Sequence, residues 1–175
     1  ICKERGEKNL ALGDGSHIPF KDASFHLVTT VDFLEHADDD AGVLQELKRV
    51  VQKDGFVLIS VPAHPFLFTT HDKALKHKRR YSQKMLKDLL KNAGFKIERI
   101  SYFNFLLFPI ALLIRFLRKV KGVESEPKPD TSIHIPPLLN DLLFFVMKLE
   151  ALWLKRFSLP TGLSLIALAK PQKDQ

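Results

Sequence analysis

Three polar clusters in the first half of the chain carry side chains that could bind a ligand or move a proton. The first is the turn Gly13-Asp14-Gly15-Ser16, which combines a carboxylate with glycines that let a ligand approach the backbone. The second contains Asp32, Glu35 and His36 and directly follows an apolar stretch rich in Phe, Val and Thr. The third is the run HDKALKHKRRYS, which begins at His71. Ligands in open α/β sheets bind at the carboxyl ends of strands, so the first two clusters predict a site at such an edge.

Alternating strand and helix patterns surround these clusters. Short apolar segments predict strands at residues 9–12 and 25–31, and residues 1–5 resemble the end of a helix. A helix is predicted at residues 41–51, because leucines and valines recur there at steps of three and four. A turn at Lys53-Asp54-Gly55 then leads into FVLISV, an apolar run typical of a strand buried on both faces.

The second half of the chain predicts further helices and strands. Residues 63–82 form a polar stretch that we expect to be a loop outside the core. Ser82 is a favourable cap for the helix that follows, and Gly94 suits the residue after its end. The remaining predicted elements are a helix at 83–92, a strand at 95–102, helical segments at 105–121 and 138–157, an exposed linker at 122–137 and a strand at 163–169.

Three stretches of the chain together resemble the class I S-adenosylmethionine-dependent methyltransferases of the small-molecule type. They are GDGSHIPFKDASFHLV (residues 13–28), DFLEHADD (32–39) and LKRVVQKDGFVLISVP (47–62), in that order and spacing. The resemblance implies an α/β fold with a Rossmann-like methyltransferase sheet, in which the last strand runs antiparallel between the fifth and sixth. It also implies one partial domain over residues 1–175, comprising strands three to seven, with a helical insert or lid at 103–160.

The glycine-rich loop that this family places after its first strand has no counterpart here. No G-x-G-x-x-G-like run occurs in the 175 residues. We therefore expect an amino-terminally truncated domain that binds the cofactor weakly or not at all. In the family's sheet the segment at residues 9–12 would pair with an absent strand, so it should be displaced or should weaken the fold.

The resemblance implies that S-adenosylmethionine is the cofactor. It assigns the adenine amino group to the Asp14 carboxylate, with the backbone of Gly15 and Ser16 beside the ring. Asp32 and Phe33 would line the methionine and sulfonium part of the site. The alternatives are that Asp14 only shapes its own turn and that Asp32 only caps the next segment.

His36 is the candidate catalytic residue, as a general base or a substrate contact, because imidazole exchanges protons near neutral pH. A structural histidine satisfied by Asp39 or by backbone is the alternative. Some similar methyltransferases hold a divalent cation with acidic and histidine residues at this point, which would involve Asp32 and Glu35 as well. With only three ligands in view, we predict no metal site.

The third cluster resembles a stretch that lies over the substrate in a subgroup of bacterial and archaeal methyltransferases. An arginine there could bind a phosphate or carboxylate of the substrate. Alternatively, the Arg-Arg-Tyr part anchors the loop, and the first His and Asp pair with each other. The candidate substrate-binding residues are His71, Asp72, His77, Arg79, Arg80 and Tyr81.

Composition narrows the class of partners. The net charge is +7, and residues 71–99 hold ten Lys or Arg against three Asp or Glu. The basic region and the phenylalanine-rich segment at 103–157 leave open a rival function, a non-catalytic module that docks on an anionic membrane, although lid packing is the simpler role for that segment. Nucleic acid is disfavoured because aromatic and basic residues do not interleave. With a single cysteine and no visible signal peptide, we expect a protein that is cytoplasmic or peripheral at the inner membrane face and acts on a small-molecule or lipid-linked substrate.

Overall fold

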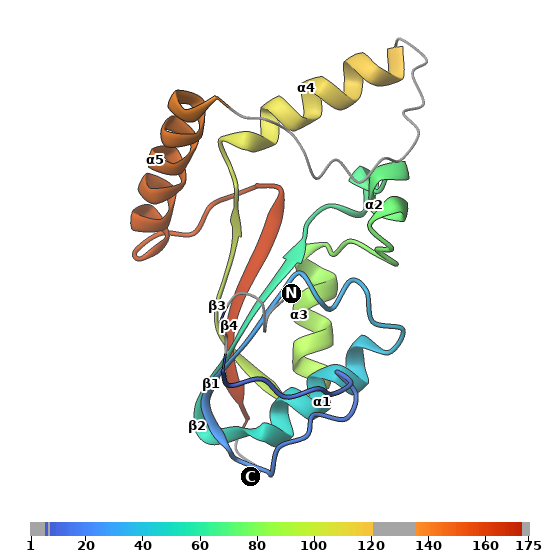
Figure 1. Cartoon of the computed structure of the whole chain (residues 1–175), viewed down its shortest axis with the longest axis vertical. Coiled ribbons are helices and arrows are strands. Elements are labelled where there is room, and N and C mark those ends of the chain that lie inside the picture. Colours follow the sequence, from blue (N-terminus) through green and yellow to red (C-terminus); the bar gives the residue numbers. More distant parts are fainter. Residues whose placement is uncertain (1–5, 7, 121–135, 173–175) are drawn as a thin grey trace.

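The computed structural model describes residues 6, 8–120 and 136–172 (Figure 1). The elements run in the order β1 (Phe25–Val31), α1 (Asp40–Val50), β2 (Val51–Pro62), the 3-10 turn η1 (Pro65–Leu67), α2 (Thr70–Ala74), α3 (Gln83–Asn92), β3 (Phe95–Phe103), α4 (Leu107–Val120), α5 (Pro137–Leu154) and β4 (Ser164–Pro171). The helix end predicted at residues 1–5 lies outside the described residues.

The four described strands form one sheet in the order β1-β2-β4-β3. β1 pairs with β2 in parallel, whereas β4 runs antiparallel to both β2 and β3. The last strand thus lies between the predicted fifth and sixth strands of the family, as expected. The Rossmann-like fold class is confirmed.

The strand predicted at residues 9–12 is wrong. This segment has no strand pairing, and the side chain of Leu12 is 100% exposed. A strand forms only where a neighbouring backbone satisfies its donors and acceptors, and none of the described strands pairs with this segment. Of the two outcomes expected for this segment, a displaced segment or a weakened fold, the structure shows a segment outside the sheet of described strands.

The turn predicted at residues 53–55 is also wrong, because β2 already begins at Val51. The pairing register between β1 and β2 shifts across this region, from Phe25↔Val51 to Leu27↔Phe56. A Cβ on Gly55 would lie 2.7 Å from the His26 carbonyl oxygen, so glycine permits the close approach of the two backbones. The glycine signal marks an irregular strand rather than a turn.

Both helices after the parallel strands cover the same side of the sheet. α1 packs against β2 and α3 packs against β3, and Figure 1 shows them side by side. Their apolar stripes bury the core with alternate residues of the strands, among them Leu44, Leu86, Val57, Ile59 and Leu165. On the other strand face, Leu27 and Phe56 remain exposed. The sheet is thus covered on one face by described residues.

The ends of α3 follow the predicted signals. Ser82 accepts a hydrogen bond from the Met85 N–H through its side chain, and Gly94 has φ +79°. α1 begins after Asp39, whose carboxylate accepts from the Gly42 N–H. Local capping chemistry therefore sets these boundaries.

Helices α4 and α5 lie beyond the end of the sheet, apart from α1 and α3 (Figure 1). Every residue of α5 is described and none is buried; Phe144, for example, is 71% exposed. The lid packing expected for this helix is therefore not seen. Most of the predicted linker lies outside the described residues. No helix in the described ranges is long and apolar enough to cross a membrane.

An ion pair on α1 fixes the segment that precedes β1. Glu46 accepts hydrogen bonds from the Ile18 N–H at 2.9 Å and from two nitrogens of Arg49 at 2.8 Å. Arg49 in turn donates to the backbone carbonyls of Ile18 and Phe20 and to Asp22. The hydrogen bonds from Arg49 lower the pKa of the Glu46 carboxyl to about 2.

We expect Glu46→Gln to reduce the free energy of unfolding at pH 7 by about 1–3 kcal/mol, because charge-assisted hydrogen bonds are lost. A lowered folded-state pKa gives stability that is present above the unfolded value of 4.5 and lost as pH falls towards 2. The difference between wild type and variant should therefore shrink across that window. Urea unfolding at several pH values measures it, with the exposed Asp54→Asn as control; a difference that is constant with pH contradicts the assignment.

Candidate functional site at the carboxyl edge of the sheet

The first polar cluster forms a tight turn beside α1. Asp14 Oδ1 accepts hydrogen bonds from the Ser16 N–H and from the Ser16 hydroxyl, both at 2.9 Å. These bonds lower the pKa of the exposed Asp14 carboxyl, which therefore stays ionised. The turn-shaping role considered for Asp14 is thus present. Its Oδ2 has no hydrogen-bond partner among the described residues and is free to accept one.

Gly15 brings this turn against the loop that follows β1. A Cβ at Gly15 would lie 2.6 Å from the ring atoms Cε1 and Cζ of Phe33 and 3.5 Å from a methyl group of Val43 in α1. The contact joins residues that are 18 positions apart in the sequence. Two of the three predicted clusters therefore lie together.

Asp32 directly follows β1 and has a left-handed conformation with φ +48°. Its N–H donates to the Ser60 carbonyl at 3.1 Å, and its Oδ1 accepts from the Ser60 hydroxyl at 3.3 Å. A non-glycine residue in this region of φ is uncommon, and such residues concentrate at functional sites. The geometry directs the chain away from the sheet at the edge where β1 and β2 end.

Glu35 is completely buried just beyond this point. Neither carboxylate oxygen has a hydrogen-bond partner among the residues that the structure describes. Burial raises the pKa of this carboxyl, and the charge of nearby Asp32 raises it further. A buried carboxyl without partners is costly and calls for a structural or functional explanation.

Two histidines lie next to Glu35. The rings of His36 and His77 meet edge to face with centroids 4.7 Å apart, and His77 Nε2 is 3.9 Å from Glu35 Oε1. His36 Nδ1 is 3.3 Å from the Lys76 carbonyl oxygen. Of the two structural partners considered for His36, the backbone is therefore the one observed. The role of His36 as a catalytic base stays a prediction.

Asp72 and Arg80 form a buried ion pair that holds His77. Arg80 donates to Asp72 Oδ1 at 2.7 Å, and His77 Nδ1 lies 3.2 Å from the same oxygen. Thr69 satisfies Oδ2 through its N–H and its hydroxyl. Burial alone would raise the pKa of Asp72, but these hydrogen bonds outweigh it and hold the pKa below its usual value.

This arrangement corrects two expectations. Residues 63–82 are not a loop outside the core, because they include helix α2 and the buried Asp72, Arg80 and Tyr81. His71 does not pair with Asp72 and is exposed. Polar residues enter the interior here because each one has a charged or hydrogen-bonding partner.

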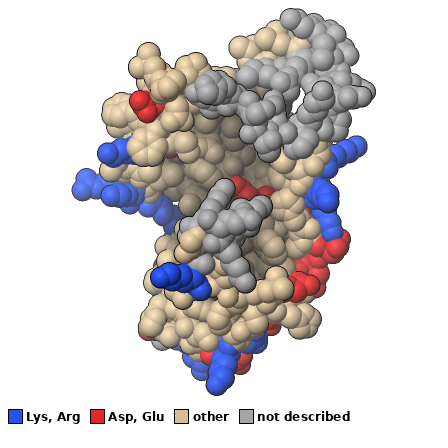
Figure 2. All heavy atoms as spheres, viewed as in Figure 1, with Lys and Arg blue, Asp and Glu red and all other residues tan. Residues whose placement is uncertain are grey.

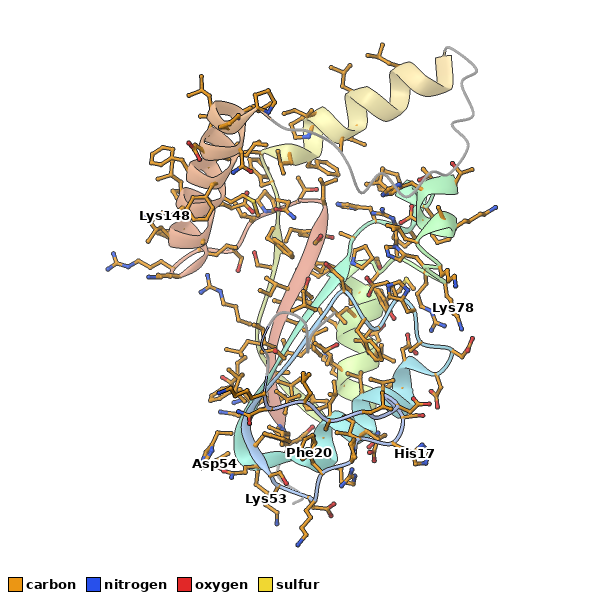
Figure 3. All side chains as sticks on the ribbon, in the orientation of Figure 1. His17, Phe20, Lys53, Asp54, Lys78 and Lys148 are labelled. Atoms are coloured by element: carbon orange, nitrogen blue, oxygen red, sulfur yellow. The ribbon has the colours of Figure 1, made fainter. Side chains whose placement is uncertain are left out.

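Arg79 and Tyr81 anchor this segment to the loop after β1. Arg79 donates to the carbonyls of Ala37 and Asp38 and pairs with Asp40 at 2.8 Å. The Tyr81 hydroxyl donates to Asp40 at 2.8 Å and lies 3.3 Å from the Leu34 carbonyl. Lys78, which is labelled in Figure 3 and belongs to the same segment, pairs with Asp38. The anchoring alternative therefore holds for Arg79 and Tyr81, and contact of the cluster with a substrate stays a prediction.

His64 is a polar residue at this edge that the sequence analysis missed. It follows β2 with φ +61°, stacks on Tyr102 with centroids 5.1 Å apart and lies 3.2 Å from the Thr161 hydroxyl through Nε2. Burial lowers its pKa, so the ring is biased towards the neutral form. The available signal was a histidine directly before a proline at the end of a predicted strand.

Charge does not collect into one patch over the surface drawn in Figure 2, where Lys and Arg lie mainly along the margins. Some of the positive charge of residues 71–99 is paired, as Arg79 with Asp40 and Arg80 with Asp72 show. A broad basic surface is therefore not the feature that defines the site.

Comparisons with known proteins agree with this architecture. Residues 1–59 match the family model described as a methyltransferase domain. A Mycolicibacterium smegmatis protein named as an S-adenosylmethionine-dependent methyltransferase is 32% identical over 88 residues, which is 49% of this chain and 34% of the relative. Protein MJ1123 of Methanocaldococcus jannaschii, which is uncharacterized, is 28% identical over 103 residues, 55% of this chain and 50% of the relative. The chain thus spans about a third to a half of these relatives.

Solved structures share the fold at low sequence identity. A Bacillus halodurans protein described as a methyltransferase has a TM-score of 0.53 at 19% identity, over 92% of this chain and 76% of that one. Phosphoethanolamine N-methyltransferase 2 of Haemonchus contortus, solved with S-adenosyl-L-methionine, has a TM-score of 0.52 at 16% identity. The match covers 91% of this chain and 36% of that one. The [4+2]-cyclase SpnF has a TM-score of 0.54 at 15% identity, over 99% of this chain and 60% of that one.

The strand order, the antiparallel last strand and the polar groups at the carboxyl edge define a Rossmann-like α/β domain of the methyltransferase type. With residues 1–59 matching a methyltransferase domain, this chain is similar in fold and in part of its sequence to the class I S-adenosylmethionine-dependent methyltransferases. The cofactor of that family is S-adenosylmethionine.

We expect Asp72→Ala to destabilise the fold by about 3–5 kcal/mol, because Arg80 would remain buried without its partner. Asp88→Ala is the matched control, since Asp88 forms an exposed pair with Lys84 on α3. Because that pair is exposed to solvent, its loss should leave the free energy of unfolding nearly unchanged. Urea unfolding followed by circular dichroism compares them; equal losses in the two variants would show that the Asp72 pair does not stabilise this segment.

Proposed function

We propose that this domain catalyses transfer of the methyl group of S-adenosylmethionine to a small-molecule or lipid-linked acceptor at the carboxyl edge of β1 and β2. The contact between Gly15 and Phe33 is the observation that carries the proposal. It joins an ionised acidic turn to the loop that leaves β1, which are the two places where the family resemblance puts the adenosine and methionine parts of the cofactor.

The Asp14 turn suits an adenine ring in one specific way. Ser16 already donates its N–H to Asp14 Oδ1, so that N–H is not available to the ring. The free Oδ2 can accept a hydrogen bond from the exocyclic amine, because an ionised carboxylate only accepts. The exposed ring of Phe33 offers an apolar surface next to it.

The residues after β1 would serve the other end of the cofactor. Asp32 holds its exposed carboxylate at the end of the strand, where a negative charge favours the sulfonium. Methyl transfer needs chiefly close approach and alignment of the two reactants. His36 and its neighbours border this place and are suited to hold a polar atom of the acceptor.

Asp14→Asn tests the adenine contact. An amide presents one acceptor without charge, so we expect affinity for S-adenosylhomocysteine to fall by about 10- to 100-fold. Because the 175 residues lack a glycine-rich loop, binding should be weak, and titration of the ¹⁵N-labelled chain by NMR suits that range.

In wild type, the amides of residues 14–16 and 32–36 should shift together on titration. Asp54→Asn, an exposed carboxylate in the irregular part of β2, is the matched control and should bind as wild type does. Shifts confined to other residues, or equal affinity in Asp14→Asn and wild type, would contradict the proposal.

A second candidate function is docking of the domain on an anionic membrane, favoured by the absence of any buried residue in α5. Phe144, Phe145 and Trp153 each leave more than half of their surface in contact with solvent. Exposed aromatic residues on a helix can enter the interface of a bilayer, and the net charge of +7 favours an anionic surface. This candidate is compatible with a lipid-linked acceptor.

Phe144→Glu should abolish sedimentation with vesicles of phosphatidylcholine and phosphatidylglycerol while leaving the melting temperature unchanged. Phe66→Glu provides the control, because Phe66 in η1 is equally exposed but lies outside α5. If wild type does not sediment with these vesicles, or if both variants lose binding equally, α5 is not the docking element.

A further inference from the structure

We propose that Glu35, His36 and His77 form a binding site for a divalent transition-metal ion, of which Zn²⁺ is the best-suited example. The site draws one carboxylate and one imidazole from the loop after β1 and the second imidazole from the segment after α2. It does not depend on methyl transfer, because its evidence is the arrangement of the three side chains.

Proximity is the first argument. One ligand atom from each of the three residues lies within 4.8 Å of the others, and His77 Nε2 is 3.9 Å from Glu35 Oε1. In a tetrahedral zinc site with bonds near 2.1 Å, neighbouring ligand atoms are separated by about 3.4 Å. The three ligand atoms thus lie within about 1.4 Å of the spacing in a formed site.

The buried carboxyl of Glu35 is the second and independent argument. Its side chain is 0% exposed and both oxygens lack hydrogen-bond partners among the described residues, although it lies beside two imidazoles. Protonation would remove the charge but would leave the oxygens unsatisfied. A cation bound between Glu35 and the two rings supplies the missing partner.

The hydrogen bonds behind the imidazoles are the third argument. His77 Nδ1 faces Asp72, and His36 Nδ1 faces the Lys76 carbonyl. Histidines that bind metals nearly always donate the N–H of their other nitrogen to a carboxylate or a backbone carbonyl. In both rings this leaves the lone pair on Nε2.

The types of ligand select the class of ion. Two imidazoles and one carboxylate suit zinc and the neighbouring transition metals, whereas Mg²⁺ and Ca²⁺ prefer oxygen ligands. Three protein ligands leave a coordination position for water or for an oxygen or nitrogen of a bound molecule. Asp32, considered from the sequence as a third ligand, instead accepts a hydrogen bond from Ser60, and His77 takes that place.

Isothermal titration calorimetry of the chelator-treated chain with ZnCl₂ tests the site. Cys2→Ser is the background, because it removes the single thiol of the sequence. We expect one Zn²⁺ per folded chain and an optical spectrum typical of nitrogen and oxygen ligands when Co²⁺ replaces it. Absence of saturable binding at one ion per chain overturns the proposal, as does tighter binding of Mg²⁺ than of Zn²⁺.

Variants then locate the ion. His36→Ala and His77→Ala should each weaken Zn²⁺ binding by more than about 100-fold, since each removes a ligand and outer-shell changes already cost 10- to 100-fold. His26→Ala, an exposed histidine on β1, is the matched control and should bind as the background does. His36→Ala leaves the Asp72–Arg80 pair intact, so circular dichroism should show that it is folded. Equal affinity in the His26 and His36 variants overturns the proposal.

Discussion

The buried pairing of Asp72 with Arg80 is the interaction on which the candidate site depends. It allows the strongly polar segment after β2 to enter the interior, where Arg79 and Tyr81 then bind the loop after β1. Without that pairing the segment would have no means of burying its charges. The consequence is that His77, from one loop, lies against Glu35 and His36 of the other. The Asp72–Arg80 pair thereby brings together side chains that could bind a ligand or exchange a proton.

The sheet gives this arrangement a rigid base. β1 and β2 end side by side, and Ser60 fixes the exit of the chain at Asp32 through two hydrogen bonds. On the other side of the loop, Phe33 packs on Gly15 and connects the site to the acidic turn at Asp14. The turn is held to α1 through Ile18 and Glu46. Each part of the candidate cofactor site is thus tied to a regular element.

The sequence correctly predicted features that depend on neighbouring residues, such as the cap and the apolar spacing of a helix. Residues 83–92 formed a helix as predicted, because Ser82 caps it and its leucines recur at helical spacing. Residues 9–12 are a short, largely apolar run that predicted a strand, but they pair with no described strand, and pairing is not a local property. For the same reason the partnership of Glu35 with His77, 42 positions apart, could not be found from spacing. The polarity of Asp72 and Arg80 suggested exposure, since burial of such residues depends on a partner that composition does not reveal.

The proposed cofactor site lies at the carboxyl edge between the Asp14 turn and the loop after β1. Ultraviolet crosslinking of S-adenosyl-[methyl-³H]methionine to the chain, followed by tryptic digestion and mass spectrometry, tests it directly and tolerates weak binding. Cleavage after lysine places the two elements in separate peptides, residues 9–21 and 22–48. If the cofactor binds at this edge, we expect label in these two peptides, and S-adenosylhomocysteine should displace it. Label confined to other peptides, or label that S-adenosylhomocysteine does not displace, would contradict it.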